Sequence, residues 1–348
     1  MSVFKIAVAG CGLIGREHIK RIQENSLTEL SAIVDPTDEA KSVATQIGCE
    51  YYSSLEQMFE HQLPSGVIIA TPNHLHVEHT LCCIKAGTAA LVEKPLADDL
   101  AGAERLCELI ESYQAKVLVG HHRAHSPIVD TATRIIKDGV LGELVAIQGS
   151  ATFYKPDYYF EEAPWRKVRG GGPILINLIH EIGNLRQMCG EIKAVQAMSS
   201  NATRKFDVED TAAITLMFEN GALGTFILSD TAASARSWEQ TSRENPSYSS
   251  YSDEDCYVIS GTSGTLSVPT MRLKTFSSKE DRSWWKELNC STVELVREDP
   301  LKFQLQHFCS VISGEVQPLV SAHDGLKNLK VVDAIQRSIR LGGTVEIK

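Results

Sequence analysis

Apolar and polar residues along the first 120 positions alternate in blocks that are typical of strands taking turns with helices. Short apolar runs predict buried parallel strands at 3–9, 30–34, 66–70, 89–92 and 117–120. Amphipathic stretches predict helices after the first run, up to residue 47, and over 76–86 and 99–113. This order predicts a doubly wound parallel sheet, the α/β Rossmann class, over residues 1–122.

Beyond residue 122 the pattern changes to a few helices and longer strands. These strands are expected to pair with one another and not to alternate with helices. Asn220 and Gly221 predict a tight hairpin with positive φ angles between strands at 212–218 and 222–229. A second hairpin is expected around residues 261–264. Residues 123–348 are therefore predicted to form a second, α+β domain that carries the substrate site and the oligomer contacts.

The strand at 212–218 has apolar residues on both alternating faces. One face carries Ala213, Thr215 and Met217, and the other carries Ile214, Leu216 and Phe218. This pattern is typical of a sheet that is covered on both faces. Helices can cover one face and a second subunit the other, so we expect a homodimer or homotetramer.

Three glycines, Gly10, Gly12 and Gly15, follow the first strand and open the first helix. Gly10 permits a tight turn, Gly12 lets a pyrophosphate approach the backbone, and Gly15 lets the helix pack closely on the strand. The phosphates are expected at the helix N-terminus. Asp35 lies about twenty residues beyond the last glycine, where it suits the adenosine ribose hydroxyls and repels a 2′-phosphate. The spacing predicts a dinucleotide site that prefers NAD to NADP.

The length and composition are typical of a soluble enzyme with two domains that each bury a hydrophobic core. The chain has 348 residues, of which 43% are hydrophobic and 22% are charged. A formal net charge of −10 without any basic run argues against nucleic acid and anionic membranes as partners. No apolar stretch approaches the roughly eighteen residues that span a bilayer. Nine cysteines without a CxxC pair, and a beginning that resembles a buried strand, predict reduced thiols and a cytoplasmic location.

Two segments are candidates for catalysis. Lys94 follows Glu93 at the carboxyl end of a predicted parallel strand, the edge where doubly wound folds hold ligands. Its position alone fits a surface lysine before a proline turn equally well. Further along, the glycines at 170–172 and a proline precede a predicted helix, on which Asn177 and His180 are three residues apart and share one face.

Five segments together are similar to those of a known family: AVAGCGLIG, ATPNHLHVEH, VEKPLA, GHHR and GGGPILINLIHEIGNLR. Over essentially its whole length the chain resembles the glucose–fructose oxidoreductase, inositol dehydrogenase and rhizopine catabolism (Gfo/Idh/MocA) family. The resemblance implies a Rossmann domain followed by an open, mostly antiparallel sheet that mediates oligomerisation. It also implies NAD-linked oxidation of a hydroxyl group on a sugar, cyclitol or related polyol.

The resemblance also implies roles for individual residues. A cofactor role falls to Gly10, Gly12, Leu13, Ile14, Gly15, Asp35, Thr71, Asn73, His76, Glu93 and Lys94. The catalytic role falls to Lys94 and His180. In our hypothesis His180, with an intrinsic pKa of about 6.5, accepts the hydroxyl proton, while Lys94 hydrogen-bonds the same oxygen and stabilises its developing negative charge.

Position 176 departs from the family pattern. Many members have an aspartate four residues before the histidine, whereas this chain has Ile176. Asn177 is the nearest polar residue; it can orient His180 or bind a substrate hydroxyl, but it cannot take a proton. The identity of the base is therefore open between His180 and Lys94.

Further side chains are candidates for the substrate pocket: Arg123, Tyr154, Lys155, Trp165 and Arg166. Aromatic rings stack on sugar C–H faces and arginine donates to hydroxyls, although packing inside the protein explains these residues equally well. His74, His76 and His79 diverge on a turn and a helix, so we predict no metal site. The polar stretch 234–255 is long for a connection, as lids and subunit arms are.

The sequence thus predicts an NAD-dependent dehydrogenase for a small polyhydroxylated substrate, with the substrate and the oxidised carbon undefined. Two alternatives stay open: a glycoside hydrolase of the same fold that retains its NAD, and an NAD-binding regulator without turnover. Ile176 favours the regulator. Lys94 and His180 argue against it.

Overall fold

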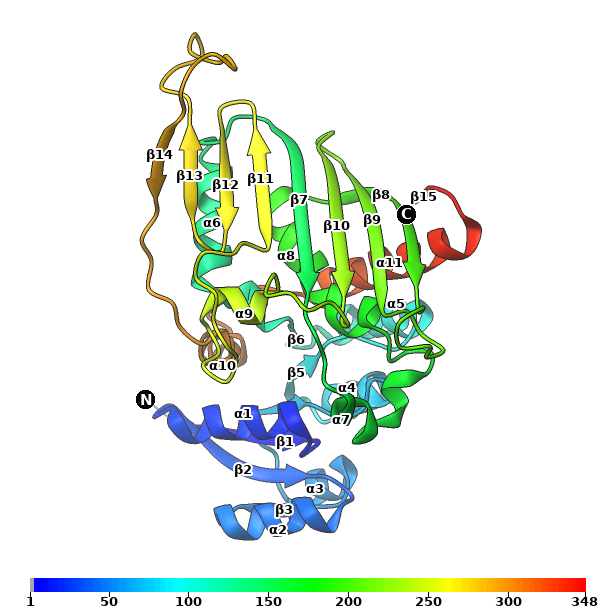
Figure 1. Cartoon of the computed structure of the whole chain (residues 1–348). Helices are drawn as coiled ribbons and strands as arrows, with labels where there is room; N and C mark the ends of the chain where they lie inside the picture. The colour runs from blue at the N-terminus through cyan, green and yellow to red at the C-terminus, as the bar shows by residue number, and fades with distance from the viewer. Residues whose placement is uncertain (1–2) are drawn as a thin grey trace. The chain divides into compact units, whose positions relative to one another are not determined.

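A computed structural model describes residues 3–348 (Figure 1). The chain forms two compact units. The first contains the residues up to His122 and the later segment Leu301–Leu329, and the second contains Arg123–Pro300 and Lys330–Lys348. These units differ from the predicted division at residue 122 in one respect, because residues 301–329 pack with the first unit.

The first unit is built on a six-stranded sheet in the order β3-β2-β1-β4-β5-β6. Its strands, all parallel, are β1 (Phe4–Ala9), β2 (Thr28–Val34), β3 (Glu50–Tyr52), β4 (Gly66–Ile69), β5 (Ala89–Glu93) and β6 (Val117–Gly120). Val8, Ile68 and Leu91 stand side by side across three of them and are fully buried. Such continuous burial is expected of a parallel sheet with helices on both faces.

The helices between these strands are α1 (Leu13–Glu24), α2 (Asp38–Ile47), α3 (Leu55–His61), α4 (His76–Lys85) and α5 (Leu100–Tyr113). Side chains of Thr37, Ser54 and Asp99 accept hydrogen bonds from the first turns of α2, α3 and α5, so each of these helices begins at a capped residue. The predicted doubly wound fold is confirmed. The short elements β3 and α3 were not predicted.

Parts of two later helices complete the first unit. The helix α10 (Pro300–Ser313) belongs to it from Leu301 onward, and the helix α11 (Ala322–Leu341) belongs to it as far as Leu329. Leu305 and Phe308 of α10 share one hydrophobic cluster with Ile19 and Ile22 of α1. Phe308 lies so close to Gly66 that an added Cβ there would approach its ring to 2.8 Å. The first sheet is therefore covered partly by residues about 240 positions further along the chain.

The second unit is built on a nine-stranded sheet in the order β14-β13-β12-β11-β7-β10-β9-β8-β15. The strands are β7 (Leu144–Thr152), β8 (Ile192–Ser200), β9 (Thr211–Phe218), β10 (Leu223–Ser229), β11 (Tyr257–Gly261), β12 (Gly264–Val268), β13 (Arg272–Thr275), β14 (Asn289–Thr292) and β15 (Val345–Glu346). Every neighbouring pair is antiparallel except β7 and β10. The expected open, mostly antiparallel sheet is confirmed.

Among the described residues, helices cover only one face of this sheet (Figure 1). In Figure 1, α6 (Pro127–Lys137) and α8 (Ile179–Cys189) lie behind the strands, and the face toward the viewer carries no helix of the described residues. Burial along β9 alternates accordingly: Ile214, Leu216 and Phe218 are buried, whereas Met217 is 43% exposed. Within one chain the sheet is thus covered on one face, and a second subunit over the other stays a prediction.

The two predicted hairpins are present, β9–β10 and β11–β12. The first differs in its turn. Gly221 has φ +88°, but Asn220 is not among the positive-φ residues, and Gly221 N–H donates to the Phe218 carbonyl at 3.0 Å. Phe218 N–H in turn donates to the Ala222 carbonyl at 2.9 Å, which leaves a three-residue loop. Asn220 thus lacks the expected positive φ, and the hairpin closes through a three-residue loop with Gly221 at the positive-φ position.

No helix within residues 3–348 combines the length and the apolar character that a membrane crossing requires.

Candidate functional site

The glycine loop between β1 and α1 makes close backbone contacts at two of its three glycines. Gly10 has φ +93°, and a Cβ there would lie 2.5 Å from the Ala70 carbonyl oxygen. A Cβ on Gly15 would lie 2.0 Å from the Gly10 carbonyl oxygen. Both positions exclude any side chain, because backbone carbonyl oxygens occupy the space that it would need.

Gly12 is different, because a Cβ there would meet nothing within 4 Å. It stands at the N-cap of α1 and provides no side-chain cap, and the next residue, Leu13, is 82% exposed. The first N–H groups of the helix have no side chain that caps them, and glycine leaves the space next to them open. Such an arrangement favours the binding of a phosphate. The loop thus fits a dinucleotide pyrophosphate by its shape.

Asp35 follows β2, and its carboxylate organises the glycine loop. One oxygen accepts from Cys11 N–H at 2.8 Å, and the other accepts from Thr37 N–H at 2.9 Å and from the Thr37 hydroxyl at 2.6 Å. Close by, Arg16 donates to the Cys11 carbonyl at 3.1 Å and pairs with Glu39 at 2.6 Å. Two carboxylates and one paired arginine therefore surround this end of the loop.

Glu93 supports the Lys94 turn, which follows β5. Its carboxylate is buried and accepts from Lys94 N–H at 3.2 Å, and its other oxygen lies 2.7 Å from His18 Nε2. The Lys94–Pro95 peptide is cis, and Lys94 itself is half-buried. Glu93 thus fixes the backbone of Lys94 from inside the unit.

His76 connects this turn to the end of β4. Its Nδ1 lies 2.7 Å from the Pro95 carbonyl oxygen and its Nε2 lies 2.9 Å from the Thr71 carbonyl oxygen. Burial lowers the pKa of His76, and the two carbonyls oppose this shift. The Thr71 hydroxyl lies 3.0 Å from His79 Nδ1, and Asn73 opens a 3₁₀ turn, Asn73–Leu75. In this structure His76 spans two backbone segments, which makes it a positioning residue.

In the second unit, glycines shape the segment before His180. A Cβ on Gly171 would lie 2.3 Å from the Trp165 carbonyl oxygen, and one on Gly172 would lie 2.5 Å from a Glu209 carboxylate oxygen. The same Glu209 oxygen accepts from Ile174 N–H at 2.8 Å, and burial raises the pKa of this carboxyl. Glu209 therefore caps the start of a π-helical turn, Ile174–Leu178, that leads directly into α8.

His180 is the second residue of α8 and is buried, with 7% of its surface exposed. Ile176 and Asn177 belong to the π-helical turn and are half-buried. Asn177 Oδ1 accepts a hydrogen bond of 2.7 Å from Lys155 Nζ. Asn177 thus contacts a lysine that precedes it by 22 positions.

Lys155 belongs to a group of charged and polar side chains that we call the Lys155 cluster: Lys155, Asn177, Arg204, Glu209 and Asp230. Lys155 Nζ lies 3.5 Å from Asp230 Oδ2, and Arg204 Nε donates to Asp230 Oδ1 at 3.0 Å. Arg204 also donates to the Lys155 carbonyl at 2.7 Å. Sequence reasoning included Lys155 among pocket residues but missed Arg204, Glu209 and Asp230. The parallel pairing of β7 with β10, which brings Asp230 to Lys155, gives no local signal.

The remaining pocket candidates lie around this cluster. Tyr154 and Trp165 are exposed, at 57% and 51%. The Arg204 guanidinium lies 5.2 Å from the centre of the Tyr154 ring. Arg166 donates to the Tyr159 carbonyl at 2.5 Å and lies 3.7 Å from the centre of that ring. Arg166 is thus engaged within the protein, whereas the two aromatic side chains are open to a ligand.

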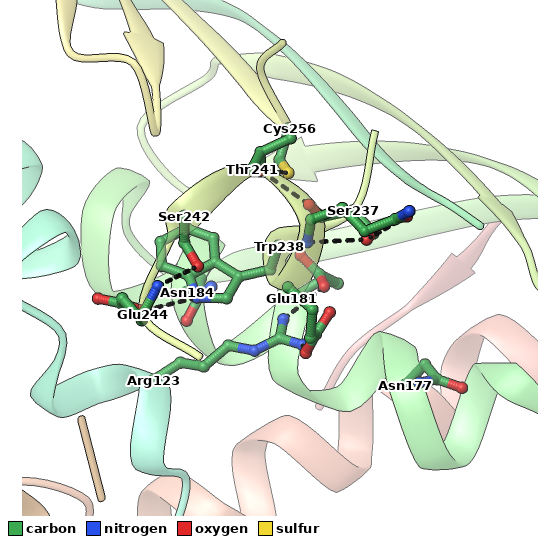
Figure 2. Close-up of polar contacts among 12 residues, drawn as sticks. Arg123, Asn177, Glu181, Asn184, Ser237, Trp238, Thr241, Ser242, Glu244 and Cys256 are labelled. Carbon is green, nitrogen blue, oxygen red and sulfur yellow. Dashed lines mark hydrogen bonds and ion pairs between the residues drawn. The ribbon is translucent and has the colours of Figure 1, made fainter. Parts of the chain in front are cut away.

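Arg123 has a different environment from the one that the sequence suggested (Figure 2). It is 3% exposed and donates to Glu181 Oε1 at 2.5 Å, and its other terminal nitrogen donates to Glu239. Its guanidinium lies 5.8 Å from the centre of the Trp238 ring. Both terminal nitrogens are used inside the unit, so this placement gives no support to the predicted contact with substrate.

The same network anchors the polar stretch 234–255 (Figure 2). Tyr257 donates to Glu181, which directly follows His180, and Trp238 Nε1 donates to Glu244 at 2.9 Å. Glu244 also accepts from Ser126, and burial raises its pKa to about 7. Trp238–Ser242 forms a short helix, α9. The stretch therefore has a buried, hydrogen-bonded base, and sequence reasoning missed the part that Glu181 plays in it.

No group of three or more histidine, cysteine, aspartate or glutamate side chains within residues 3–348 is arranged to hold a metal ion. His76 contacts two carbonyls and His79 contacts Thr71, as described above.

Comparison with known proteins identifies both parts of the chain. Residues 4–121 match the model described as the GFO_IDH_MocA oxidoreductase family, NAD-binding Rossmann fold, and residues 129–267 match the GFO/IDH/MocA C-terminal domain. These two matches confirm the resemblance that the motifs suggested. They also agree with the two sheets described above.

Individual relatives are distant. The chain is 26% identical to the D-apiose dehydrogenase of Paraburkholderia graminis in an alignment of 363 positions that covers 99% of this chain and 90% of that protein. It is 26% identical to the rhizopine catabolism protein MocA of Rhizobium meliloti over 194 residues, a partial match that spans 55% of this chain and 59% of that protein. The crystal structure of the WlbA dehydrogenase from Bordetella pertussis, in complex with NADH and UDP-GlcNAcA, is similar in fold, with a TM-score of 0.79, 20% identity and 99% coverage of both chains.

The contrast between Gly12 and Gly15 gives a matched pair of substitutions. We expect Gly15→Ala to lower the free energy of unfolding by on the order of 1–3 kcal/mol, because its Cβ would lie 2.0 Å from a carbonyl oxygen. We expect Gly12→Ala to unfold like the wild type but to bind NAD on the order of tenfold more weakly. Chemical denaturation and isothermal titration calorimetry measure the two effects. Equal stability of both variants would contradict the assigned roles.

Proposed function

Because the chain belongs to the GFO/IDH/MocA family of NAD(P)-dependent oxidoreductases, we propose that it oxidises a hydroxyl group of a sugar, cyclitol or sugar acid. The single observation that carries this proposal is the Lys94 turn. It presents a lysine at the carboxyl end of β5, in the unit that holds the glycine loop, and a buried carboxylate fixes its backbone. The glycine loop supplies the cofactor site.

The proposed part of Lys94 is electrostatic. An ammonium group near a hydroxyl oxygen stabilises the negative charge that develops as the proton leaves. Glu93 and His76 hold the turn from two sides, through Lys94 N–H and the Pro95 carbonyl, so that the ammonium starts from a fixed backbone. A preorganised donor of this kind does not reorganise during the reaction.

The proposed part of His180 is to contact the same hydroxyl group, as a hydrogen-bond partner or as the acceptor of its proton. His180 is buried at the start of α8, and Glu181 beside it is held by Arg123 and Tyr257. This support fixes the helix that carries the ring. A bound nicotinamide supplies the hydride acceptor, and the chain's own residues supply the acid–base chemistry.

We propose NAD as the cofactor in preference to NADP. Asp35 and Glu39 bring two carboxylates to the end of the glycine loop, and the nearby Arg16 is paired with one of them. A 2′-phosphate would have to approach both negative charges, whereas ribose hydroxyls can donate to a carboxylate.

We also propose that the second sheet joins copies of the chain into a homodimer or homotetramer. Met198, Ala213 and Ile227 lie opposite one another on β8, β9 and β10, and all three are exposed. Met198 and Ile227 are 77% and 41% exposed, which is unusual for adjacent apolar side chains.

A cytoplasmic location is part of the same proposal. All nine cysteines are thiols in the structure, and burial raises the pKa of several of them, including Cys82 to about 11. Such thiols are typical of a reducing compartment.

The dehydrogenase activity is tested by NADH formation with a panel of aldoses, cyclitols and sugar acids. We expect substrate-dependent NADH with at least one class, and a loss of roughly a hundredfold or more in kcat for Lys94→Ala and for His180→Ala. Lys85→Ala, at the end of α4, serves as the matched control. Conversion of a substrate without net NADH would favour the NAD-retaining hydrolase, and no turnover despite NAD binding would favour the regulator.

The cofactor preference is tested by calorimetric titration with NAD and NADP. We expect NAD to bind at least tenfold more tightly, and the preference to shrink in Asp35→Ser and in Glu39→Gln because each removes a negative charge. Equal affinities of the wild type for both cofactors would refute the role of Asp35.

The oligomer is tested by light scattering coupled to size-exclusion chromatography. We expect at least twice the chain mass of 38.2 kDa for the wild type. Adding charge to the exposed face, with Met198→Asp and Ile227→Asp, should lower the mass to that of one chain. Leu63→Asp, at another exposed apolar residue, is the control. A wild type of 38.2 kDa at micromolar concentration would contradict the proposal.

A further inference from the structure

Lys155 carries a buried amine whose positive charge is only partly balanced by its neighbours. It is 8% exposed, and its Nζ contacts two oxygen atoms: Asn177 Oδ1 at 2.7 Å and Asp230 Oδ2 at 3.5 Å. Asp230 is not its partner alone, because Arg204 donates to the other oxygen of that carboxylate at 3.0 Å. The single negative charge of Asp230 thus faces two cations.

The sheet explains this arrangement. β7 and β10 are parallel, and Thr152 pairs with Ser229 at their ends. Lys155 and Asp230 follow these ends by three residues and one residue, so both arrive at the same edge of the sheet. The Lys155 N–H also donates to the Asp230 carbonyl at 2.9 Å, which ties the two backbones together.

The surroundings weaken the binding of a proton to this amine. Burial is the largest effect on Lys155; Asp230 opposes it, and Arg166 and Arg204 add to it. Together they lower the pKa of Lys155 to about 8. The other groups that face the amine are the Glu209 carboxyl and the rings of Tyr159 and Phe153, whose centres lie 5.0 and 5.6 Å from Nζ.

This amine adjoins the segment in which the proton acceptor is in doubt. The segment contains Ile176 and Asn177, and neither side chain can take a proton. We propose that Lys155 is the proton acceptor of the active site, held in place by Asn177 and Asp230. This inference rests on the proposed dehydrogenase function and leaves His180 as a hydrogen-bond partner of the reacting oxygen.

The proposed step is balanced. The O–H bond of the substrate breaks, and its proton forms the third N–H bond on the neutral Lys155 Nζ. The neighbouring C–H bond breaks, and its hydrogen leaves with both electrons to the oxidised dinucleotide that the family activity requires. The alcohol carbon becomes a carbonyl carbon. Solvent later takes the proton from the ammonium and restores the amine.

The acidity of Lys155 is measured first, without substrate. In protein labelled with ¹³C and ¹⁵N lysine, the Lys155 Cε resonance is identified by its disappearance in Lys155→Arg. We expect this resonance to titrate with a midpoint near pH 8. A Lys155 midpoint above pH 10 overturns the proposal whatever the activity of the protein is.

The pH dependence of kcat/KM is measured next, with a substrate from the panel. We expect the wild-type rate to rise with pH through about 8, because only the neutral amine accepts a proton. Lys155→Arg keeps the charge but cannot accept a proton, and Lys155→Met removes the amine. Both should lose a hundredfold or more in kcat/KM and lose this rise. Lys193→Met is the matched control.

The variants also separate catalysis from folding. In Lys155→Met, Asp230 still pairs with Arg204, and thermal unfolding reports any loss of structure. A rise through about pH 6.5 that persists in Lys155→Arg would assign the proton to His180 and overturn the proposal. Absence of wild-type turnover at every pH would refute the dehydrogenase function, and with it this role. That result differs from a failure of Lys155 alone, in which the wild type is active and Lys155→Arg matches it.

Discussion

Parallel strands end at a common edge, and this constraint positions the candidate groups of both units. In the first unit the glycine loop follows β1, Asp35 follows β2, and Lys94 follows β5. In the second unit the single parallel pair, β7 and β10, brings Lys155 beside Asp230. At such an edge the backbone leaves the sheet ladder, so side chains and free N–H groups are available for a ligand.

Burying charge at these edges requires partners, and the two units meet that requirement in the same way. Glu93 is buried with His18 and the Lys94 N–H, and Arg123 is buried between Glu181 and Glu239. Removing one member of such a set leaves the other buried and unpaired, which costs several kcal/mol. Buried polar contacts of this kind hold the backbone of the candidate residues in place, and they need no contact with a ligand.

Sequence patterns predicted the doubly wound fold, the glycine loop and both hairpins, because each depends on residues that are close in the sequence. They missed β3 and α3, which are too short for a periodic signal. They also missed the partners of Lys155. Asp230 follows it by 75 positions, and only a parallel pairing of distant strands brings the two together. The burial of Arg123 likewise depends on Glu239, which is 116 positions away.

The π-helical turn before His180 changes how position 176 should be compared with other proteins. A π turn contains one more residue than an α turn, and one residue corresponds to about 100° of rotation around a helix axis. Side chains within Ile174–Leu178 therefore point in directions that an uninterrupted α-helix would not give them. Counting three or four residues back from His180 selects a position in the sequence but not a direction in space. Two chains that differ only in this turn can present different residues to the same substrate atom.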